Sequence, residues 1–178
     1  MSSIMLKHYS RADIDSIREL LLDIHDEAHA TQEDGKDPFR ARERFAGFVD
    51  HWSSRDGFLC TIAYAGDEPI GYAYGAPSTP GREWWRETDY TPADDRSSTY
   101  ALSELLLRPK WRKTGAAQQI HAGHLAERSE HLAVLLVDAT HPKVRGLYED
   151  WGYAKVGEQK PFEDSPVFDV MVKRLPAG

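Results

Sequence analysis

The sequence of 178 residues contains a single cysteine, Cys60, so no disulfide bond can form within the chain. The first ten residues, MSSIMLKHYS, contain no apolar run of signal-peptide length, and no later stretch is long and apolar enough to span a bilayer. No internal repeat or low-complexity tract is visible. These absences favour a reducing, cytoplasmic location and argue against a small disulfide-stapled secreted fold.

Positive charge is also scarce, because 22 Lys and Arg stand against 29 Asp and Glu, a formal net charge of −7. Nucleic-acid-binding proteins usually carry clustered Lys and Arg, so the balance argues against that class. An acidic surface suits a cationic partner, but it also keeps a protein soluble, and charge alone does not rank these two readings. The length and the 40% hydrophobic content suffice for one compact domain with a full core over residues 1–178.

Periodicity predicts helices near the start of the chain. Ser10 and Asp13 resemble a capping box, and the apolar residues behind them recur at helical spacing, which predicts a helix over residues 11–29. A polar loop over residues 31–36 follows. Asp37 then reads as an N-cap before a proline at the first helical position, so a second helix is expected to begin there.

The remaining chain alternates between strand and helix patterns. Residues 58–65 and 70–76 predict a hairpin around a turn at 66–69. Further strands are predicted over residues 100–107, 133–137, 153–159 and 167–174, and further helices over residues 115–128 and from Pro142 to a stop at Gly152. The resulting order, β-α-α-β-β-β-α-β-α-β-β, is typical of an α/β or α+β sandwich with helices on a mixed sheet.

Residues 77–98 show no periodicity, and loops of this length in a compact domain are usually functional or disordered. Trp84, Trp85 and Tyr90 favour a flap that folds back onto the domain. Its aromatic and acidic side chains would suit a cationic or sugar-like amine. A solvated loop with two tryptophans attached to the domain explains the composition equally well.

The segment after residue 104 carries the clearest chemistry. A strand ends, a basic loop with Arg112 and Lys113 follows, and Gly115 leads directly into a helix. The free N–H groups and positive dipole end of a helix N-terminus form an anion site. Gly115 and the two alanines after it permit close approach to the backbone, so the segment predicts a pyrophosphate site.

This segment resembles a known family signature. Arg112-Lys-Thr-Gly-Ala-Ala117 is similar to the Arg/Gln-x-x-Gly-x-Gly/Ala motif of GNAT acyltransferases, and residues 141–153 resemble that family's Asn-x-x-Ala-x-x-Leu-Tyr-x-x-x-Gly-Phe segment. Residues 65–72 resemble its second hairpin, and the element order matches from end to end. The resemblance implies a single GNAT-like acetyltransferase domain, of α/β (α+β) class, with a mixed, mostly antiparallel sheet of about seven strands flanked by about four helices.

The resemblance also implies that acetyl-CoA is the co-substrate and that the enzyme is an N-acetyltransferase. The backbone around Leu105, Leu106 and Leu107 would then hold the pantetheine arm of the cofactor. The pyrophosphate would be held by Arg112, Lys113, Thr114, Gly115, Ala116 and Ala117. His141 stands where the family often has Asn, so it would contact the cofactor or act as a base of its own.

Two residues are candidates for proton transfer. By the resemblance, Tyr148 would protonate the departing CoA thiolate. A base must deprotonate the incoming ammonium, because only a neutral amine has a lone pair for attack, and Glu104 occupies the strand position where several family members carry a catalytic carboxylate. On spacing alone, Tyr148 is also a packed aromatic residue and Glu104 a solvated strand carboxylate.

The sequence says less about the acceptor molecule than about the cofactor. In GNAT proteins the flap and the first two helices shape the acceptor site, which makes Glu27, Trp84, Trp85 and Tyr90 candidate substrate-binding residues. A weak indication of a cationic acceptor also comes from the acidic residues near the end of the first helix, Asp26, Glu27, Glu33 and Asp34. A small polyamine-like or aminoglycoside-like amine is the first expectation and a protein or peptide amine the second. Dimers are common in this family.

Two other classes of function stay open. His25-Asp-Glu-Ala-His29 resembles the His-Glu-x-x-His string of zinc peptidases, but Asp replaces the Glu and no third ligand is evident, so a polar helix end is the preferred reading. A non-catalytic acyl-CoA-binding module is the other alternative, against which the presence of Glu104 and Tyr148 weighs. Cys60 is poorly placed to act as an acyl carrier.

Overall fold

The computed structural model describes residues 3–30 and 37–176, so the predicted loop with Glu33 and Asp34 lies outside the described residues. Its elements are β1 (Ile4–Ser10), η1 (Arg11–Asp13), α1 (Ile14–Ala28), η3 (Pro38–Arg40), α2 (Arg42–Ser53), β2 (Leu59–Ala65), β3 (Glu68–Pro77), η4 (Trp84–Glu87), β4 (Thr99–Leu107), η5 (Pro109–Trp111), α3 (Ala116–Leu125), β5 (Leu132–Asp138), α4 (Pro142–Asp150), β6 (Ala154–Gln159) and β7 (Phe168–Arg174). The predicted order of helices and strands is confirmed.

The strands form one seven-stranded sheet in the order β1-β2-β3-β4-β5-β7-β6. β4 and β5 run parallel, whereas β1 and β2, β2 and β3, β5 and β7, and β6 and β7 pair antiparallel. The chain divides into two compact units, one made of the described parts of residues 1–76 and 104–127 and the other of 77–103 and 128–176. β4 contributes to both units. A single domain over residues 1–178 stays a prediction.

Both predicted helix starts are present, but each begins as a 3-10 turn. The Ser10 N–H donates to Asp13 Oδ2 at 2.8 Å, which confirms the capping box, and the α-helix proper begins at Ile14. The Phe39 N–H donates to Asp37 Oδ1 at 2.9 Å, as an N-cap requires. Because Ala41 is extended, α2 begins only at Arg42, later than predicted.

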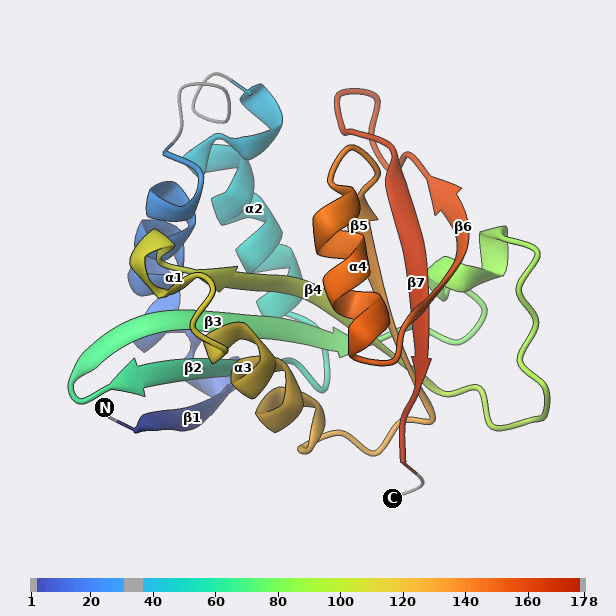
Figure 1. Cartoon of the computed structure of the whole chain (residues 1–178), viewed down its shortest axis with the longest axis horizontal. Helices are drawn as coiled ribbons and strands as arrows, with labels where there is room; N and C mark the ends of the chain where they lie inside the picture. Colours follow the sequence, from blue (N-terminus) through green and yellow to red (C-terminus); the bar gives the residue numbers. More distant parts are fainter. Residues whose placement is uncertain (1–2, 31–36, 177–178) are drawn as a thin grey trace. The chain divides into compact units, whose positions relative to one another are not determined.

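In the first unit, helices cover both faces of the sheet. The Tyr72 hydroxyl donates to the Leu21 carbonyl of α1 at 2.9 Å, whereas Thr61, on the opposite face of β2, bonds His124 of α3 at 2.7 Å. Figure 1 accordingly shows α1 and α2 behind β1–β3 and α3 in front of them. The core between these layers includes Ile17, Leu21, Ile24, Phe45, Val49, Cys60, Ile62, Ile70, Tyr72, Tyr74 and Ile120.

In the second unit, α4 and the segment 78–98 cover opposite faces of the sheet. Asp169 and Lys173 of β7 contact α4, which Figure 1 shows in front of β5. Arg174 points to the other face, where it lies 3.8 Å from Asp94. The predicted flap is therefore a folded covering of the sheet. None of the helices in the described ranges has the length and apolar character that a membrane-spanning helix requires.

Candidate active site

The segment between β4 and α3 forms a backbone concavity. Lys113 and Gly115 both adopt left-handed conformations, with φ of 62° and 87°, and α3 begins at Ala116. Within the described part of the chain, no backbone carbonyl accepts a hydrogen bond from the N–H of Lys113, Thr114 or Gly115. Consecutive N–H groups in such turns bind anions, and the adjacent helix N-terminus adds its positive dipole end. The loop is therefore a candidate anion site, and its role toward a pyrophosphate stays a prediction.

Two arginines tie this loop to the C-terminal end of α1. Arg112 donates from Nη2 to the Ala28 carbonyl at 2.8 Å. Arg108 donates from Nε to the Pro69 carbonyl at 2.7 Å and forms an ion pair with Glu27. Cations at a helix C-terminus are favourable because they offset the negative dipole end. Glu27, a predicted substrate-binding residue, is thus engaged by an arginine of the protein itself.

The end of β4 is closely packed on one edge. The Arg108 N–H donates to the Ile70 carbonyl at 2.9 Å, and a Cβ on Gly71 would lie only 2.5 Å from the Leu106 oxygen, so β3 needs glycine there. The parallel ladder with β5 pairs only residues 99–101 with 132–134. Backbone groups of Leu105 and Leu107 therefore lie outside that ladder, and their role toward a pantetheine arm stays a prediction.

Glu104 is a half-buried carboxyl group on β4. Burial raises its pKa to about 7, although the positive charge of Arg40 acts in the opposite direction. Its charge also acts on the buried Tyr72 ring of β3. Among the described residues, no side chain forms a hydrogen bond or ion pair with this carboxylate. A carboxyl group with a pKa near neutrality can exchange a proton at physiological pH, which a general base requires.

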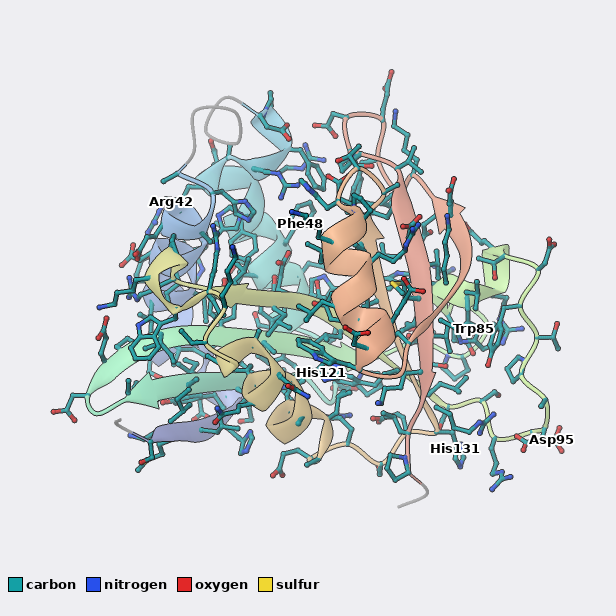
Figure 2. The ribbon with its side chains drawn as sticks, viewed as in Figure 1. Arg42, Phe48, Trp85, Asp95, His121 and His131 are labelled. Carbon is teal, nitrogen blue, oxygen red and sulfur yellow. The ribbon has the colours of Figure 1, made fainter. Side chains whose placement is uncertain are left out.

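Arg40 is a component of this site that the sequence did not reveal. Its charge acts on both Glu104 and His25, although it lies far from Glu104 in the chain. The nearby Arg42, labelled in Figure 2, instead forms ion pairs with Glu19, Asp23 and Asp26. No sequence motif links Arg40 to Glu104, because only the packing of η3 brings the two charges into range.

The histidine string of α1 is packed rather than arranged for a metal. His25 is buried and stacks on Phe45 with the ring centroids 3.8 Å apart. Burial, followed by the charge of His29, lowers the pKa of His25 to about 4, so it is neutral at physiological pH. In the residues that the structure describes, no three His, Cys, Asp or Glu side chains are grouped to hold a metal ion, so the zinc-peptidase reading gains no third ligand.

The second unit holds the remaining candidates. Tyr148 is half-buried on α4, and its ring contacts Trp151 and Tyr153 edge-on with centroids 5.2 and 5.6 Å away. His141 is the exposed N-cap residue of α4, and its carbonyl accepts the Val144 N–H at 3.1 Å. Both side chains are therefore placed by the same short helix.

The aromatic residues of the flap lie on the face of the sheet opposite α4. Trp85, labelled in Figure 2, is buried, donates from Nε1 to Thr99 Oγ1 at 2.9 Å and contacts Tyr90 edge-on at 5.7 Å. Trp84 is half-buried. Within this unit the structure does not bring these residues together with Tyr148. Packing accounts for Trp85, and the substrate-binding role of all three stays a prediction.

The structure thus sorts the predicted site residues into two groups. The first unit holds Glu27, Glu104, Leu105, Leu106, Leu107, Arg112, Lys113, Thr114, Gly115, Ala116 and Ala117, and the second holds Trp84, Trp85, Tyr90, His141 and Tyr148. Cys60 is fully buried, and burial raises the pKa of its thiol, as expected for a residue that carries no acyl group.

Gly115→Ala tests the backbone of the anion loop. At φ of 87° an added Cβ costs about 1–2 kcal/mol, so we expect a lower melting temperature and weaker binding of CoA. Gly47 in α2 is the matched control, because a Cβ there meets nothing within 4 Å and its backbone is helical. Gly47→Ala should raise stability by about 0.5–1 kcal/mol. Equal effects of the two substitutions in melts and CoA titrations would contradict this assignment.

Comparison with known proteins identifies the fold. Neither a protein-family model nor a curated protein matches the sequence. Among solved structures, a putative GNAT-family acetyltransferase from Desulfovibrio desulfuricans is 16% identical with a TM-score of 0.64, covering 97% of this chain and 98% of that one. PaiA N-acetyltransferase from Thermoplasma acidophilum, solved with coenzyme A, is 14% identical with a TM-score of 0.60, covering 97% and 99%.

A third similar structure is a chimera of Vibrio cholerae spermidine N-acetyltransferase SpeG and hSSAT, which is 16% identical with a TM-score of 0.59, covering 97% of this chain and 96% of that one. These likenesses span nearly the whole of each chain. The element order and the strand order of the sheet agree with the architecture that the sequence motifs predict. The chain therefore has the fold of the GNAT acetyltransferases.

Proposed function

We propose that this protein is an N-acetyltransferase that transfers the acetyl group of acetyl-CoA to the primary amine of a small cationic molecule. The observation that carries the proposal is the strand-loop-helix segment from Glu104 to Ala117. It combines a carboxyl group whose pKa is near 7 with a concave run of backbone N–H groups at a helix N-terminus. A general base and an anion site are the two functions that such a reaction requires.

Acetyl-CoA supplies an activated acyl group as a thioester. The backbone of residues 113–117 would hold its pyrophosphate, and the backbone of Leu105 and Leu107 its pantetheine arm. Arg112 supports the loop through its bond to Ala28. His141, as the exposed N-cap of α4, is our further candidate for contact with the cofactor.

Proton transfer is assigned to two side chains. Glu104 would accept a proton from the acceptor ammonium, which frees the nitrogen lone pair to form the new N–C bond as the C–S bond breaks. Tyr148 would donate its phenol proton to the departing sulfur. The nitrogen loses two protons in all. Glu104 would accept the first, and the second, lost once the N–C bond has formed, would replace the phenol proton that Tyr148 gives to the sulfur, so that the step balances. Direct attack within a ternary complex needs no acyl-enzyme, which agrees with the burial of Cys60.

The recognition of a cationic acceptor is proposed to depend mainly on Glu104. The other acids of this region are engaged, since Asp26 pairs with Arg42 and Glu27 with Arg108. Arg40 adds positive charge close to the base. A second positive charge close to the reacting nitrogen would meet Arg40. We therefore expect a monoamine to be acetylated faster than a short diamine of similar size, in contrast to the polyamine-like acceptor that the sequence suggested first.

A thermal melt with and without acetyl-CoA tests the proposed donor. At a hundredfold excess over its dissociation constant, the ligand should stabilise the fold by about 2.7 kcal/mol. This corresponds to a rise in melting temperature of several degrees, on the order of 2–4 °C per kcal/mol for a chain of this size. Adenosine alone should give no rise. No shift at millimolar acetyl-CoA would overturn the proposal.

A release assay for free CoA then tests the acceptor, with monoamines, polyamines, aminoglycosides and peptides offered in turn. Turnover of small amines alone supports the proposed acceptor class. Turnover of peptides alone would assign the activity to protein or peptide amines. Binding of acetyl-CoA with no turnover of any amine would favour the non-catalytic acyl-CoA-binding module.

A further inference from the structure

The face of β7 that contacts α4 carries one buried carboxylate with two partly exposed cationic partners. Asp169 is only 2% exposed, with Arg145 Nη1 of α4 3.4 Å from its Oδ2 and Lys155 Nζ of β6 3.0 Å from its Oδ1. Lys173, four residues further along the same face of β7, donates from Nζ to the Trp151 carbonyl at the C-terminal end of α4. The helix is therefore attached to the sheet by charged side chains at two points along its length.

Stability alone does not explain why this carboxylate is buried. Removing the Asp169 carboxylate from water is costly, and ion pairs that offset such a cost are often no more stabilising than apolar residues in the same place. Buried ion pairs with defined geometry instead restrict how two elements can sit against each other. Here the two elements are α4 and the β6-β7 hairpin. The ion pairs of Asp169 limit how far α4 can rotate about its axis or slide along it.

The position of α4 matters because of what it carries. Arg145 lies one helical turn before Tyr148, so anchoring the Arg145 guanidinium fixes the adjacent turn. The Tyr148 ring itself makes edge-on contacts with Trp151 and Tyr153. A rotation of α4 would move the phenol oxygen, and a displacement near 1 Å in a reacting group can cost on the order of a hundredfold in rate.

We propose that Asp169 is a positioning residue, which holds Arg145 and thereby fixes α4 so that the Tyr148 hydroxyl points where the reaction needs it. This inference rests on the proposed function, in which Tyr148 is the proton donor. It assigns a role to a buried carboxylate of β7, a strand that lies outside both sequence motifs, residues 112–117 and 141–153.

Asp169→Asn tests the inference, because the amide preserves the shape of the side chain and removes its charge. We expect kcat to fall about tenfold or more while the dissociation constant of acetyl-CoA changes less than about twofold. Glu83→Gln is the matched control. Glu83 is also buried and accepts two hydrogen bonds from Arg86, but it lies in the flap on the opposite face of the sheet. Its substitution should leave kcat unchanged.

A double-mutant cycle separates positioning from general damage. If Asp169 acts through Tyr148, Asp169→Asn should lower kcat in the wild-type background and have almost no further effect in a Tyr148→Phe background. Equal losses in both backgrounds would overturn the inference, because they indicate a role that does not pass through Tyr148.

A second readout does not depend on turnover. In protein with ¹³Cζ-labelled tyrosine, the Tyr148 resonance should shift in Asp169→Asn and stay in place in Glu83→Gln. An unchanged Tyr148 resonance in folded Asp169→Asn protein would overturn the inference by itself. If the wild-type protein acetylated no amine, the proposed function would fall, and the resonance would still decide whether Asp169 positions Tyr148.

Discussion

Replacing Tyr148 with Phe should lower kcat by about 10²- to 10⁴-fold, the range typical of a lost general acid. The substitution removes one hydroxyl group and keeps the ring that contacts Trp151 and Tyr153. Binding of acetyl-CoA should therefore be nearly intact, and the loss should appear in kcat rather than in the dissociation constant. Steady-state kinetics with a saturating donor, together with calorimetric titration of CoA, measure the two quantities separately.

Tyr153→Phe is the control for this variant. It removes a hydroxyl group from a tyrosine whose ring lies 5.6 Å from that of Tyr148, and the residue is buried. We expect its kcat to stay within about twofold of the wild type, because the substitution keeps the ring that contacts Tyr148 and removes no group assigned to proton transfer. If Tyr148→Phe turned over as fast as the wild type, Tyr148 would not be the proton donor.

Replacing Glu104 with Gln should abolish the acidic limb of the pH profile. The wild-type kcat/KM should rise as pH increases through about 7, because the carboxylate must be ionised to accept a proton. The Gln variant should be slower by about 10²-fold or more near neutral pH. Its deficit should shrink toward pH 10, where an alkyl amine with a pKa of about 10.4 is increasingly neutral without a base.

The same substitution should change stability in the opposite direction to activity. Burial raises the pKa of Glu104 from an ordinary 4.5 to about 7, so the folded chain holds this proton more tightly than the unfolded chain. The contribution to stability is therefore fully present below pH 4.5 and is lost as pH rises through about 7. Above that range Glu104→Gln should be more stable than the wild type, by up to about 3 kcal/mol.

Glu83→Gln is the control, because its effect on stability should depend on pH in the opposite direction. The guanidinium of Arg86 holds the pKa of Glu83 below its usual value, so this carboxylate stabilises the folded state above the unfolded pKa and loses that effect in acid. Denaturant titrations from pH 4 to pH 9 measure both variants. A Glu104→Gln protein that is no more stable than the wild type at pH 9 would contradict the raised pKa of the half-buried Glu104 carboxyl group.

Local sequence patterns predicted much of this molecule correctly. Apolar spacing located the helices and strands, and the cap at Ser10 and the glycine stop at Gly152 are present, the latter with φ of 100°. The errors are at helix boundaries, where α2 begins late after the extended Ala41 and α3 ends at Leu125 instead of Arg128. Such boundaries depend on contacts with neighbouring elements that a local pattern does not contain.

The candidate site also combines features that the sequence predicted with features that only packing produced. The sequence by itself determined the element order and the glycine turn before α3, because backbone conformation and helix ends depend on residues close along the chain. The two proton-transfer candidates and the anion role of residues 112–117 came from the resemblance to a family motif and stay predictions. Only the tertiary structure decided the pKa of Glu104, the influence of Arg40 on it and the burial of Asp169. Proton affinity and ion pairing depend on desolvation and on charges brought near by packing, and residues far apart in sequence supply both.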